Sequence, residues 1–310
     1  MKGPERAVQM TTASPGVCGK PLLAWRAFKV FAQSYQPQPW ELVTNWKGCH
    51  FPTGTHYLWV NHRRFYLSLQ LFRQYVRAAY QVLDMGVFPG TWVRLVQDLC
   101  PDLNVSLVGA GLELKPGFRD YMLSRGVSLF AVDLDRPTLE YREPIAPSAL
   151  PCEAGQFDVV CAFEILEHLR NPFHLMSEVS RVLKPGGHLL LSTNSVCYIM
   201  NVLRLLVGRT VYWHLDLLHA HRNELETREH VREYTVRELR FLFQQYGLEP
   251  VRFVLFDAAE YAARRLSLLD RGRFLISKLA SVVPWYRPNI FAVARKADTL
   301  TPPELNAHWG

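Results

Sequence analysis

Short apolar segments alternate with helical segments between residues 80 and 192, and this alternation restricts the fold more than any other feature of the chain. The apolar segments lie at residues 80–86, 105–112, 127–133, 157–162 and 188–192, and the helical segments at 91–99, 118–125 and 163–183. Strands that alternate with helices along a chain form parallel sheets through right-handed crossovers. The sequence therefore predicts an α/β fold in which helices cover both faces of a mostly parallel sheet.

The rest of the chain predicts further elements around this core. Residues 1–40 are rich in Pro, Gln, Ser and Thr, which predicts an arm that is irregular or is partly ordered by docking on the rest of the protein. Apolar residues at helical spacing over 56–80 predict a helix whose polar side is formed by Arg63, Arg64, Arg73 and Arg77. A capping box at Thr235 and Glu238 predicts a helix over 235–246, and late strands follow at 251–256 and 290–294.

These elements divide the chain into parts with different expected roles. We expect an N-terminal arm and helical cap over 1–80, a main domain over 81–296 and a C-terminal tail over 297–310. An insertion over 197–234, rich in aromatic, histidine and arginine residues, would cover the site and select the substrate. A further apolar stretch with interspersed bases, over 266–285, predicts a helix that packs one face on the domain.

Composition excludes several classes of protein. Nearly half of the 310 residues are hydrophobic, which argues against a disordered chain, and no apolar run reaches the length needed to cross a membrane. The six cysteines occur singly, and the first residues lack the apolar segment of a secretory signal. We therefore expect a cytoplasmic protein with reduced thiols.

Charge is distributed unevenly along the chain. The formal net charge of +7 divides into +8 for residues 1–80, −5 for residues 81–196 and +4 for residues 197–310. The basic surplus of the first 80 residues suggests an anionic partner, and RNA, a charged glycan and a membrane surface all fit it. No RNA-binding signature accompanies this surplus. The sequence gives no indication of an oligomeric state.

A glycine-containing loop over residues 84–91 follows the first predicted strand of the core. In doubly wound sheets such a loop binds a nucleotide-like ligand at the carboxyl ends of the strands. The loop lacks the G-x-G-x-x-G pattern of dinucleotide sites, since only Gly86 and Gly90 are glycines. Asp84 precedes it, and a carboxylate suits a ligand with an ammonium group, such as S-adenosylmethionine, better than a pyrophosphate.

Three motifs carry a resemblance to a known family. They read VLDMGVFPG at 82–90, FDVVCAFEILEHL at 157–169 and RVLKPGGHLLLSTN at 181–194. Together the three motifs resemble the class I S-adenosylmethionine-dependent methyltransferases. This resemblance implies a Rossmann-like, doubly wound, mostly parallel sheet of seven strands, with an N-terminal helical extension and a helical lid. It also implies an enzyme with S-adenosyl-L-methionine as cofactor.

The resemblance further implies a set of cofactor-binding residues. Asp84, Gly86 and Gly90 would surround the methionine part of the cofactor, and Val87 and Phe88 belong to the same loop. Phe88 stands where the family usually has glycine, which would narrow the loop. The full set is Asp84, Gly86, Val87, Phe88, Gly90, Glu113, Asp133, Leu134, Phe163 and Glu164.

The remaining members of this set are assigned to the rest of the cofactor. The family position that binds the ribose falls at Gly111, which has no carboxylate, so Glu113 is the nearest substitute. Asp133 and Leu134 would meet the adenine, with Asp135 as a rival for the carboxylate. Phe163 and Glu164 would line the pocket after the fourth core strand.

A cluster of candidate metal ligands begins at Glu164. On a helix, Glu164, Glu167 and His168 would share one face. They resemble the Glu-x-x-Glu-His motif of small-RNA 2′-O-methyltransferases and ubiquinone-biosynthesis O-methyltransferases, in which a downstream histidine, here His230, completes the set. That resemblance implies Mg²⁺ or Mn²⁺ held by all four residues, with Glu167, His168 and His230 acting in catalysis. His219 or His221 could replace or assist His230 in this set. Alternatively, no metal is bound and His168 is a general base.

The predicted function follows from the cofactor and the metal set. We expect methyl transfer to a hydroxyl of a small molecule or glycan, such as a vicinal diol or catechol, because a cation would chelate both oxygens. The alternatives are metal-independent methylation of nitrogen or carbon in a small metabolite, RNA binding with or without RNA 2′-O-methylation, and a cofactor-binding protein without activity.

Overall fold

The computed structural model of the chain describes residues 9–12, 24–43, 45–46, 49–50, 52–112, 116–135, 149–211, 230–257 and 268–298. Glu113 lies outside the described residues, as do residues 212–229 of the predicted insertion, which include His219 and His221. The predictions that concern them therefore stay predictions.

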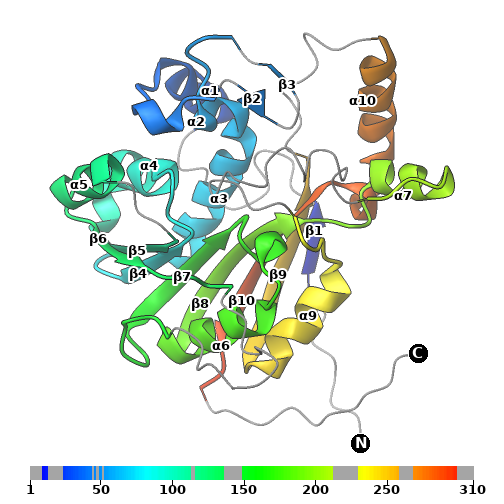
Figure 1. Cartoon of the computed structure of the whole chain (residues 1–310). Coiled ribbons are helices and arrows are strands. Elements are labelled where there is room, and N and C mark those ends of the chain that lie inside the picture. Colours follow the sequence, from blue (N-terminus) through cyan, green and yellow to red (C-terminus); the bar gives the residue numbers. More distant parts are fainter. Residues whose placement is uncertain are drawn as a thin grey trace, which may run out of the picture.

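An eight-stranded sheet forms the centre of the molecule (Figure 1). The strands lie in the order β1-β9-β10-β8-β7-β4-β5-β6, in which only β10 runs antiparallel to its neighbours. Their bounds are β1 Gln9–Thr12, β4 Gln81–Met85, β5 Ser106–Gly111, β6 Ser128–Ala131, β7 Phe157–Phe163, β8 Leu183–Asn194, β9 Leu248–Phe256 and β10 Asn289–Lys296. The predicted fold class is thus confirmed, and the seven expected strands are all present.

The eighth strand comes from the N-terminal arm, for which the sequence predicts irregular structure or partial ordering by docking. β1 pairs in parallel with β9 at the edge of the sheet, so that Gln9 faces Arg252 and Thr12 faces Leu255. This part of the arm is therefore ordered by docking, as a strand that the sequence does not predict. Four residues without a clear alternation of apolar and polar side chains carry too little signal to predict an edge strand.

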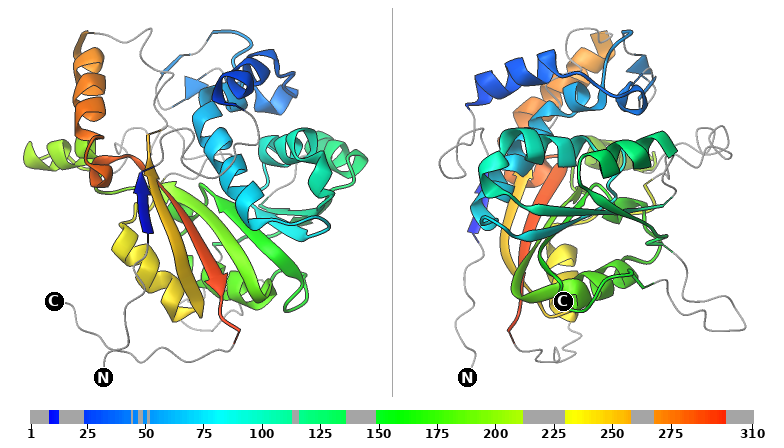
Figure 2. Two further views of the ribbon diagram at one scale, coloured as in Figure 1. Left: turned by 180° about the vertical axis from the view of Figure 1, so that it is seen from behind. Right: turned by 90° about the vertical axis from the view of Figure 1, so that its left-hand side faces the viewer.

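Helices cover both faces of the sheet (Figure 2). Alternate residues of β4 point to opposite faces, so that Val82 packs with α3 and α4 while Leu83 packs with α6 and α9. The main helices are α1 Trp25–Ser34, α2 Tyr57–Val60, α3 His62–Tyr75, α4 Thr91–Leu99, α5 Pro116–Ser124, α6 Pro172–Val182, α7 Ile199–Leu206, α9 Val236–Gln245 and α10 Leu268–Ala280. The short 3-10 helices are η1 Pro39–Glu41, η2 Pro101–Leu103, η3 Leu166–His168 and η5 Pro284–Tyr286.

Helix α9 begins as the capping box predicts. The Thr235 hydroxyl accepts a hydrogen bond from the Glu238 backbone N–H at 3.1 Å, and the Glu238 carboxylate accepts one from the Thr235 N–H at 2.8 Å. These reciprocal bonds satisfy two backbone donors that the helix itself cannot. They also fix the position of the segment just before the helix, which contains His230.

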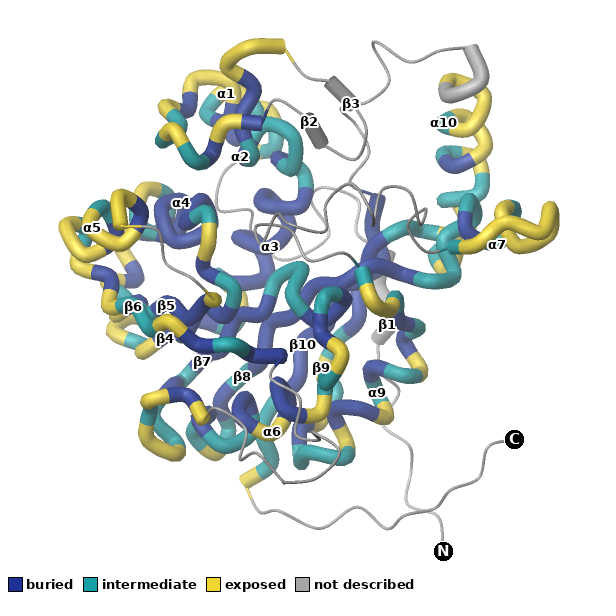
Figure 3. Tube along the Cα trace, viewed as in Figure 1, coloured by how far each residue is buried: buried dark blue, intermediate teal, exposed yellow. Residues whose placement is uncertain are grey.

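Two groups of helices flank the carboxyl ends of the strands. The helices α1–α3 lie at one side of the carboxyl ends of the strands, and α7 and α10 lie at the other (Figures 1 and 2). The hydroxyl of Tyr198 donates to Ser277 at 3.0 Å, which joins α10 to the start of α7. Several large apolar residues of these two helices remain exposed, among them Leu205, Leu206, Leu275 and Leu279 (Figure 3). Among the described residues, no helix has the length and apolarity that a membrane span requires.

Candidate active site

The order of the strands places a site at the carboxyl ends of β4 and β7. β4 and β7 are neighbours in the sheet. The connection after β4 leads to β5 on one side, and the connection after β7 leads to β8 on the other, so the two connections run in opposite directions. A crevice forms where the direction of the connections reverses, and ligands of open α/β sheets bind there. The loop after β4 and the turn after β7 both end at this point.

The loop after β4 is held by the neighbouring strand and by its own glycines. The backbone N–H groups of Gly86 and Val87 both donate to the Ala110 carbonyl, at 2.7 and 3.1 Å. Gly86 and Gly90 have φ angles of +81° and +82°, in the left-handed region that favours glycine. Gly90 precedes the first residue of α4, so the loop leads directly into the helix.

Close packing makes glycine necessary at residue 86 for a second reason. A Cβ atom at this position would lie 2.0 Å from Cδ1 of Ile165, which belongs to the turn after β7. The two segments that border the crevice therefore touch through a backbone without a side chain. This contact brings together two of the three motifs on which the family resemblance depends.

Asp84 lies in the sheet beneath the loop, where water does not reach it. Burial raises the pKa of its carboxyl group to about 8. In the register of the sheet it faces Gly109 of β5 and Cys161 of β7, neither of which carries a positive charge. A cationic ligand at the carboxyl edge would stabilise the ionised form of Asp84, and this fits a ligand with an ammonium or sulfonium group.

The two candidate carboxylates for adenine binding have different partners. The Asp135 carboxylate accepts hydrogen bonds from the backbone N–H groups of Arg170 and Asn171, at 2.5 and 3.0 Å. Asp133 accepts from the backbone N–H of Asp135 at 2.9 Å and lies two residues after the end of β6. The Asp135 carboxylate thus holds the chain before α6, and Asp133 holds the turn after β6.

Two phenylalanines assigned to the cofactor pocket pack against other aromatic rings. Phe88 is exposed, and its ring meets Phe118 of α5 edge to face at 5.3 Å. Phe163 is half-buried between Trp92 and Phe291, with ring centroids 4.9 and 6.0 Å away. Leu134 is buried. Phe88 thus covers the outside of the loop, while Phe163 packs beneath it.

The turn after β7 differs from the helix that the sequence predicts. Glu164 has a φ of +55°, residues Leu166–His168 form a single 3-10 turn, and α6 begins only at Pro172. The prediction that Glu164, Glu167 and His168 share one helical face is therefore wrong. Proline in the first turn of a helix and Asn171 as its N-cap fix the start of α6, and both are signals in the sequence.

Glu164 is held by groups other than the candidate metal ligands. One carboxylate oxygen accepts from the Ser192 hydroxyl at 2.7 Å, and the other lies 2.9 Å from the Arg64 guanidinium. Arg64 belongs to α3 and is buried, and it also donates to the Tyr57 hydroxyl at 2.6 Å. Glu164 thus forms a buried ion pair with a residue of the N-terminal cap.

Arg64 is a site residue that the sequence prediction placed on the polar side of a helix. The structure buries it on the same face of α3 as Leu67 and Leu71, which follow three and seven residues later. That spacing was the available signal, because residues at i+3 and i+7 share a face with residue i. Charge misled the prediction, since a long basic side chain usually points to solvent.

Glu167, His168 and His230 come together, as predicted. Among the described residues these three offer one ligand atom each, and the three atoms all lie within 4.8 Å of one another. The rings of His168 and His230 meet edge to face, with centroids 4.9 Å apart. Glu164 is absent from this group, so the structure brings together three of the four predicted metal ligands.

The position of His230 is set by backbone bonds to the turn after β7. The carbonyl of Glu167 accepts from the N–H groups of Val231 and Arg232, at 2.7 and 3.2 Å. The Asn194 side-chain amide lies 3.0 Å from Nδ1 of His230. Residues more than sixty positions apart are in this way fixed in one cluster at the carboxyl edge.

Glu167 is the most deeply buried member of this cluster. One of its oxygens accepts from the Thr193 hydroxyl at 2.8 Å, and the other, Oε1, has no hydrogen-bond partner in the described structure. Burial, together with the nearby charge of Glu164, raises the pKa of Glu167 to about 8. An unpartnered buried carboxylate oxygen is costly unless a proton or a cation satisfies it.

Comparison with known proteins decides the class of this site. Residues 60–252 match the family described as a methyltransferase domain, which is well over half of the chain. The chain belongs to the methyltransferase-domain family. The matched range runs from α2 to β9 and includes the loop after β4 and the cluster of Glu167, His168 and His230.

The relatives and solved structures that this chain resembles are distant. A ubiquinone biosynthesis O-methyltransferase of Albidiferax ferrireducens is 27% identical over 154 residues, which cover 50% of this chain and 52% of that protein. A second one, from Acinetobacter baumannii, is 36% identical over 55 residues, or 18% of this chain and 23% of that protein. The chain thus spans about half or less of the length of these relatives.

Among solved structures, the 1,6-didemethyltoxoflavin-N1-methyltransferase of Burkholderia thailandensis is 13% identical with a TM-score of 0.48, covering 78% of this chain and 81% of that one. An S-adenosylmethionine dependent methyltransferase from Mesorhizobium loti is 14% identical with a TM-score of 0.47, covering 73% of this chain and 95% of that one.

Proposed function

We propose that this protein is an S-adenosylmethionine-dependent O-methyltransferase. It moves a methyl group to a hydroxyl of a small molecule or glycan, with a vicinal diol or catechol as the acceptor, and a divalent cation assists. The observation that carries the proposal is the cluster of Glu167, His168 and His230, which lies at the carboxyl edge of a methyltransferase-domain sheet. The distant relatives from Albidiferax ferrireducens and Acinetobacter baumannii are O-methyltransferases, which is the same class of reaction.

The donor set of the cluster suits a divalent cation. One carboxylate and two imidazoles are ligands that Mn²⁺, Fe²⁺ and Zn²⁺ accept, and Mg²⁺ would take the carboxylate with waters. The unpartnered Oε1 of Glu167 supports this assignment, because a cation would supply the charge that this buried oxygen lacks. Thr193 holds the other oxygen and leaves Oε1 directed to the ligand.

The protein would contribute position and proton transfer to the reaction. Methyl transfer is an in-line displacement, so the acceptor oxygen must be held in line with the donor sulfur. A divalent cation would supply Lewis-acid activation of the acceptor hydroxyl. In the alternative without metal, the neutral imidazole of His168, itself a member of the cluster, would accept the proton that the hydroxyl releases. Asn194 orients His230 through the 3.0 Å contact at Nδ1.

S-adenosylmethionine would supply the electrophilic methyl group, and the chain's own residues fit such a ligand. Asp84 offers a buried carboxylate to a cationic group, and Gly86 and Gly90 allow the backbone to approach closely. Asp133 would accept from the adenine amino group, with Leu134 next to it. The segment over 81–196 has a net charge of −5, which also favours a cationic cofactor.

A direct test begins with cofactor and metal binding to the full chain. We expect calorimetry to show binding of S-adenosylmethionine, and its absence from folded protein would overturn the assignment. Mn²⁺ alone should raise the melting temperature of the wild-type protein, and this rise should disappear in Glu167→Gln and His230→Ala. His188→Gln is a matched control, because His188 lies midway along β8, opposite Val159 of β7 and beside Tyr75, and so before the carboxyl ends of the strands.

Activity then distinguishes the metal-assisted reaction from general-base catalysis alone. Cofactor turnover should be screened against catechols, glycosides and RNA 3′ ends. For an accepted substrate, EDTA should abolish turnover, and Mg²⁺ or Mn²⁺ should restore it. Turnover that survives EDTA but is lost in His168→Ala would instead assign His168 as a base without metal. Turnover with RNA alone would replace the small-molecule acceptor.

A further inference from the structure

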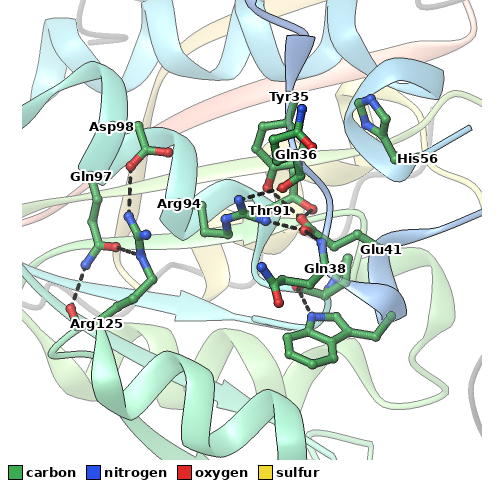
Figure 4. A network of polar contacts seen from close by, with 12 residues as sticks. Tyr35, Gln36, Gln38, Glu41, His56, Thr91, Arg94, Gln97, Asp98 and Arg125 are labelled. Carbon is green, nitrogen blue, oxygen red and sulfur yellow. Dashed lines mark hydrogen bonds and ion pairs between the residues drawn. The ribbon is translucent and has the colours of Figure 1, made fainter. Parts of the chain in front are cut away.

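A segment that precedes the matched family region contacts the loop after β4, which lies within that region. Residues 35–41 precede that region, which starts at residue 60. They end in the 3-10 helix η1 and lie against the first turn of α4 (Figure 4). We name residues 35–41 the clamp segment. Its contacts converge on three neighbouring points, at Pro89, Thr91 and Arg94.

Glu41 is the centre of these contacts. Its carboxylate is entirely buried and accepts hydrogen bonds from the Tyr35 hydroxyl at 2.7 Å and from the Thr91 hydroxyl at 2.6 Å. The Arg94 guanidinium pairs with its other oxygen, to which the Gln38 backbone N–H also donates, at 2.8 Å. All four partners donate to the carboxylate, two to each oxygen.

Arg94 and Trp40 extend the contact on both sides of Glu41. Arg94 donates to the Gln36 carbonyl at 2.9 Å, and its guanidinium lies 4.4 Å from the centre of the Tyr35 ring. The Trp40 indole N–H donates to the Pro89 carbonyl at 3.3 Å, within the loop itself. The Trp40 ring also packs edge to face on Phe118 of α5.

The points held by the clamp segment border the residues that approach the ligand. Pro89 and Thr91 flank Gly90, whose left-handed backbone ends the loop and begins α4. The N–H of Gly90 donates to the Val87 carbonyl at 2.6 Å, so a shift at Pro89 or Thr91 also displaces Val87. The loop contains only two glycines, and its conformation is supported from outside.

We propose that Trp40 and Glu41 are positioning residues for the cofactor, and that the clamp segment fixes residues 86–91 in the conformation that binds S-adenosylmethionine. This inference rests on the proposed function, since it assigns the loop to the cofactor. Trp40 and Glu41 both act through the loop, and the N-terminal extension is consequently a part of the cofactor site.

Three substitutions in the full chain test this role. Trp40→Phe keeps an aromatic ring against Phe118 and removes only the donor to Pro89. Thr91→Val keeps the shape and removes only the donor to Glu41. Glu41→Gln places an amide donor among four donors and leaves the buried Arg94 without its ion pair. The first two variants keep the test decisive if Glu41→Gln does not fold.

A matched control lies on the same helix. Asp98, at the far end of α4, pairs with Arg125 at 2.8 Å and is also seen in Figure 4. Asp98→Asn therefore breaks an ion pair of α4 without changing a contact to the loop. A general loosening of α4 would affect all four variants, whereas the proposed role affects only the three at the clamp.

Two measurements are needed, because one of them does not depend on the cofactor. In the protein without ligand, we expect hydrogen exchange of the amides in residues 86–92 to be several-fold faster in Trp40→Phe and Thr91→Val than in wild type. The dissociation constant for S-adenosylmethionine should rise about three- to tenfold in the same variants, as the loss of one hydrogen bond predicts, and further in Glu41→Gln. Asp98→Asn should leave both within twofold.

The outcomes separate the two proposals. If wild-type protein does not bind S-adenosylmethionine, the cofactor assignment fails, and this inference fails with it, whatever the exchange data show. If wild type binds and the variants bind equally well, the positioning role is overturned. Faster exchange with unchanged affinity would make the clamp segment a purely structural contact, which also contradicts the inference.

Discussion

Asp84 offers the sharpest test of how the cofactor site is built, because its burial predicts a measurable dependence of stability on pH. Burial raises the pKa of its carboxyl group in the folded protein from an ordinary 3.8 to about 8. Between these values the folded state holds a proton that the unfolded state has lost. Stability must therefore fall as the pH rises through this window, by about 1.4 kcal/mol per pH unit.

Asp84→Asn removes this titration and keeps the size of the side chain. The free energy of unfolding of the variant, relative to wild type, should therefore increase by about 3 kcal/mol between pH 5 and pH 7. Other groups titrate in this range, but they do so in both proteins and cancel in the difference. Urea unfolding followed by tryptophan fluorescence at pH 5, 6 and 7 would measure it.

The same substitution should weaken binding of the proposed cofactor, while it raises the stability of the free protein relative to wild type as the pH rises to 7. A cationic ligand favours the ionised carboxylate, so binding to wild type should release close to one proton near pH 7, and binding to the variant should release none. Calorimetry in buffers of different ionisation enthalpy measures this release. A difference in stability that stays constant from pH 5 to pH 7 would refute the reasoning, since it would place the pKa of folded Asp84 near its ordinary value.

Three further substitutions test single contacts. Gly86→Ala should abolish cofactor binding and destabilise the fold, because its Cβ would overlap the neighbouring isoleucine in a left-handed backbone; wild-type affinity in the calorimeter would contradict this. Thr235→Ala should cost about 1 kcal/mol of stability in urea unfolding, the usual worth of an N-cap, and an equal loss is not expected in Glu238→Asp, which keeps a carboxylate. Arg64→Met removes the ion-pair partner of Glu164, which keeps its bond to Ser192, and should cost about 1 to 3 kcal/mol in urea unfolding, whereas Arg64→Lys should recover part of this loss; no loss in the methionine variant would exclude the ion pair as a stabilising contact.

The core of the fold was predictable because strands and helices have different periods. Each apolar run between residues 80 and 192 is bounded by a turn, and the strands at these runs have the predicted order along the chain. The turn after β7 was harder, since the spacing of Glu164, Glu167 and His168 is equally compatible with a helix. Asn171 and Pro172 were the better signals, because they mark the start of α6 by the restrictions that proline imposes on the backbone.

The contacts of the N-terminal extension could not be predicted from local patterns. Glu41 meets Thr91 and Arg94 across 50 and 53 positions, and Trp40 meets Pro89 across 49. A single acid in a segment rich in proline and glutamine has no periodicity that would indicate its partner. The cluster of Glu167, His168 and His230 is equally distant in sequence, and it was predicted only because a resemblance related the two motifs.

The carboxylates around the crevice fall into two groups, and this division indicates what the ligands must supply. Glu41 and Glu164 are buried or nearly so, yet each has an arginine partner within the chain, and Asp135 accepts two backbone N–H groups. Asp84 and Glu167 are also buried, but burial raises the pKa of each to about 8. The fold thus supplies partners for the ionised structural carboxylates and leaves two that hold a proton near neutral pH. Asp84 lies beneath the glycine loop and Glu167 lies with the two histidines, so a cationic cofactor would favour ionisation of the first and a divalent cation ionisation of the second, each with release of a proton.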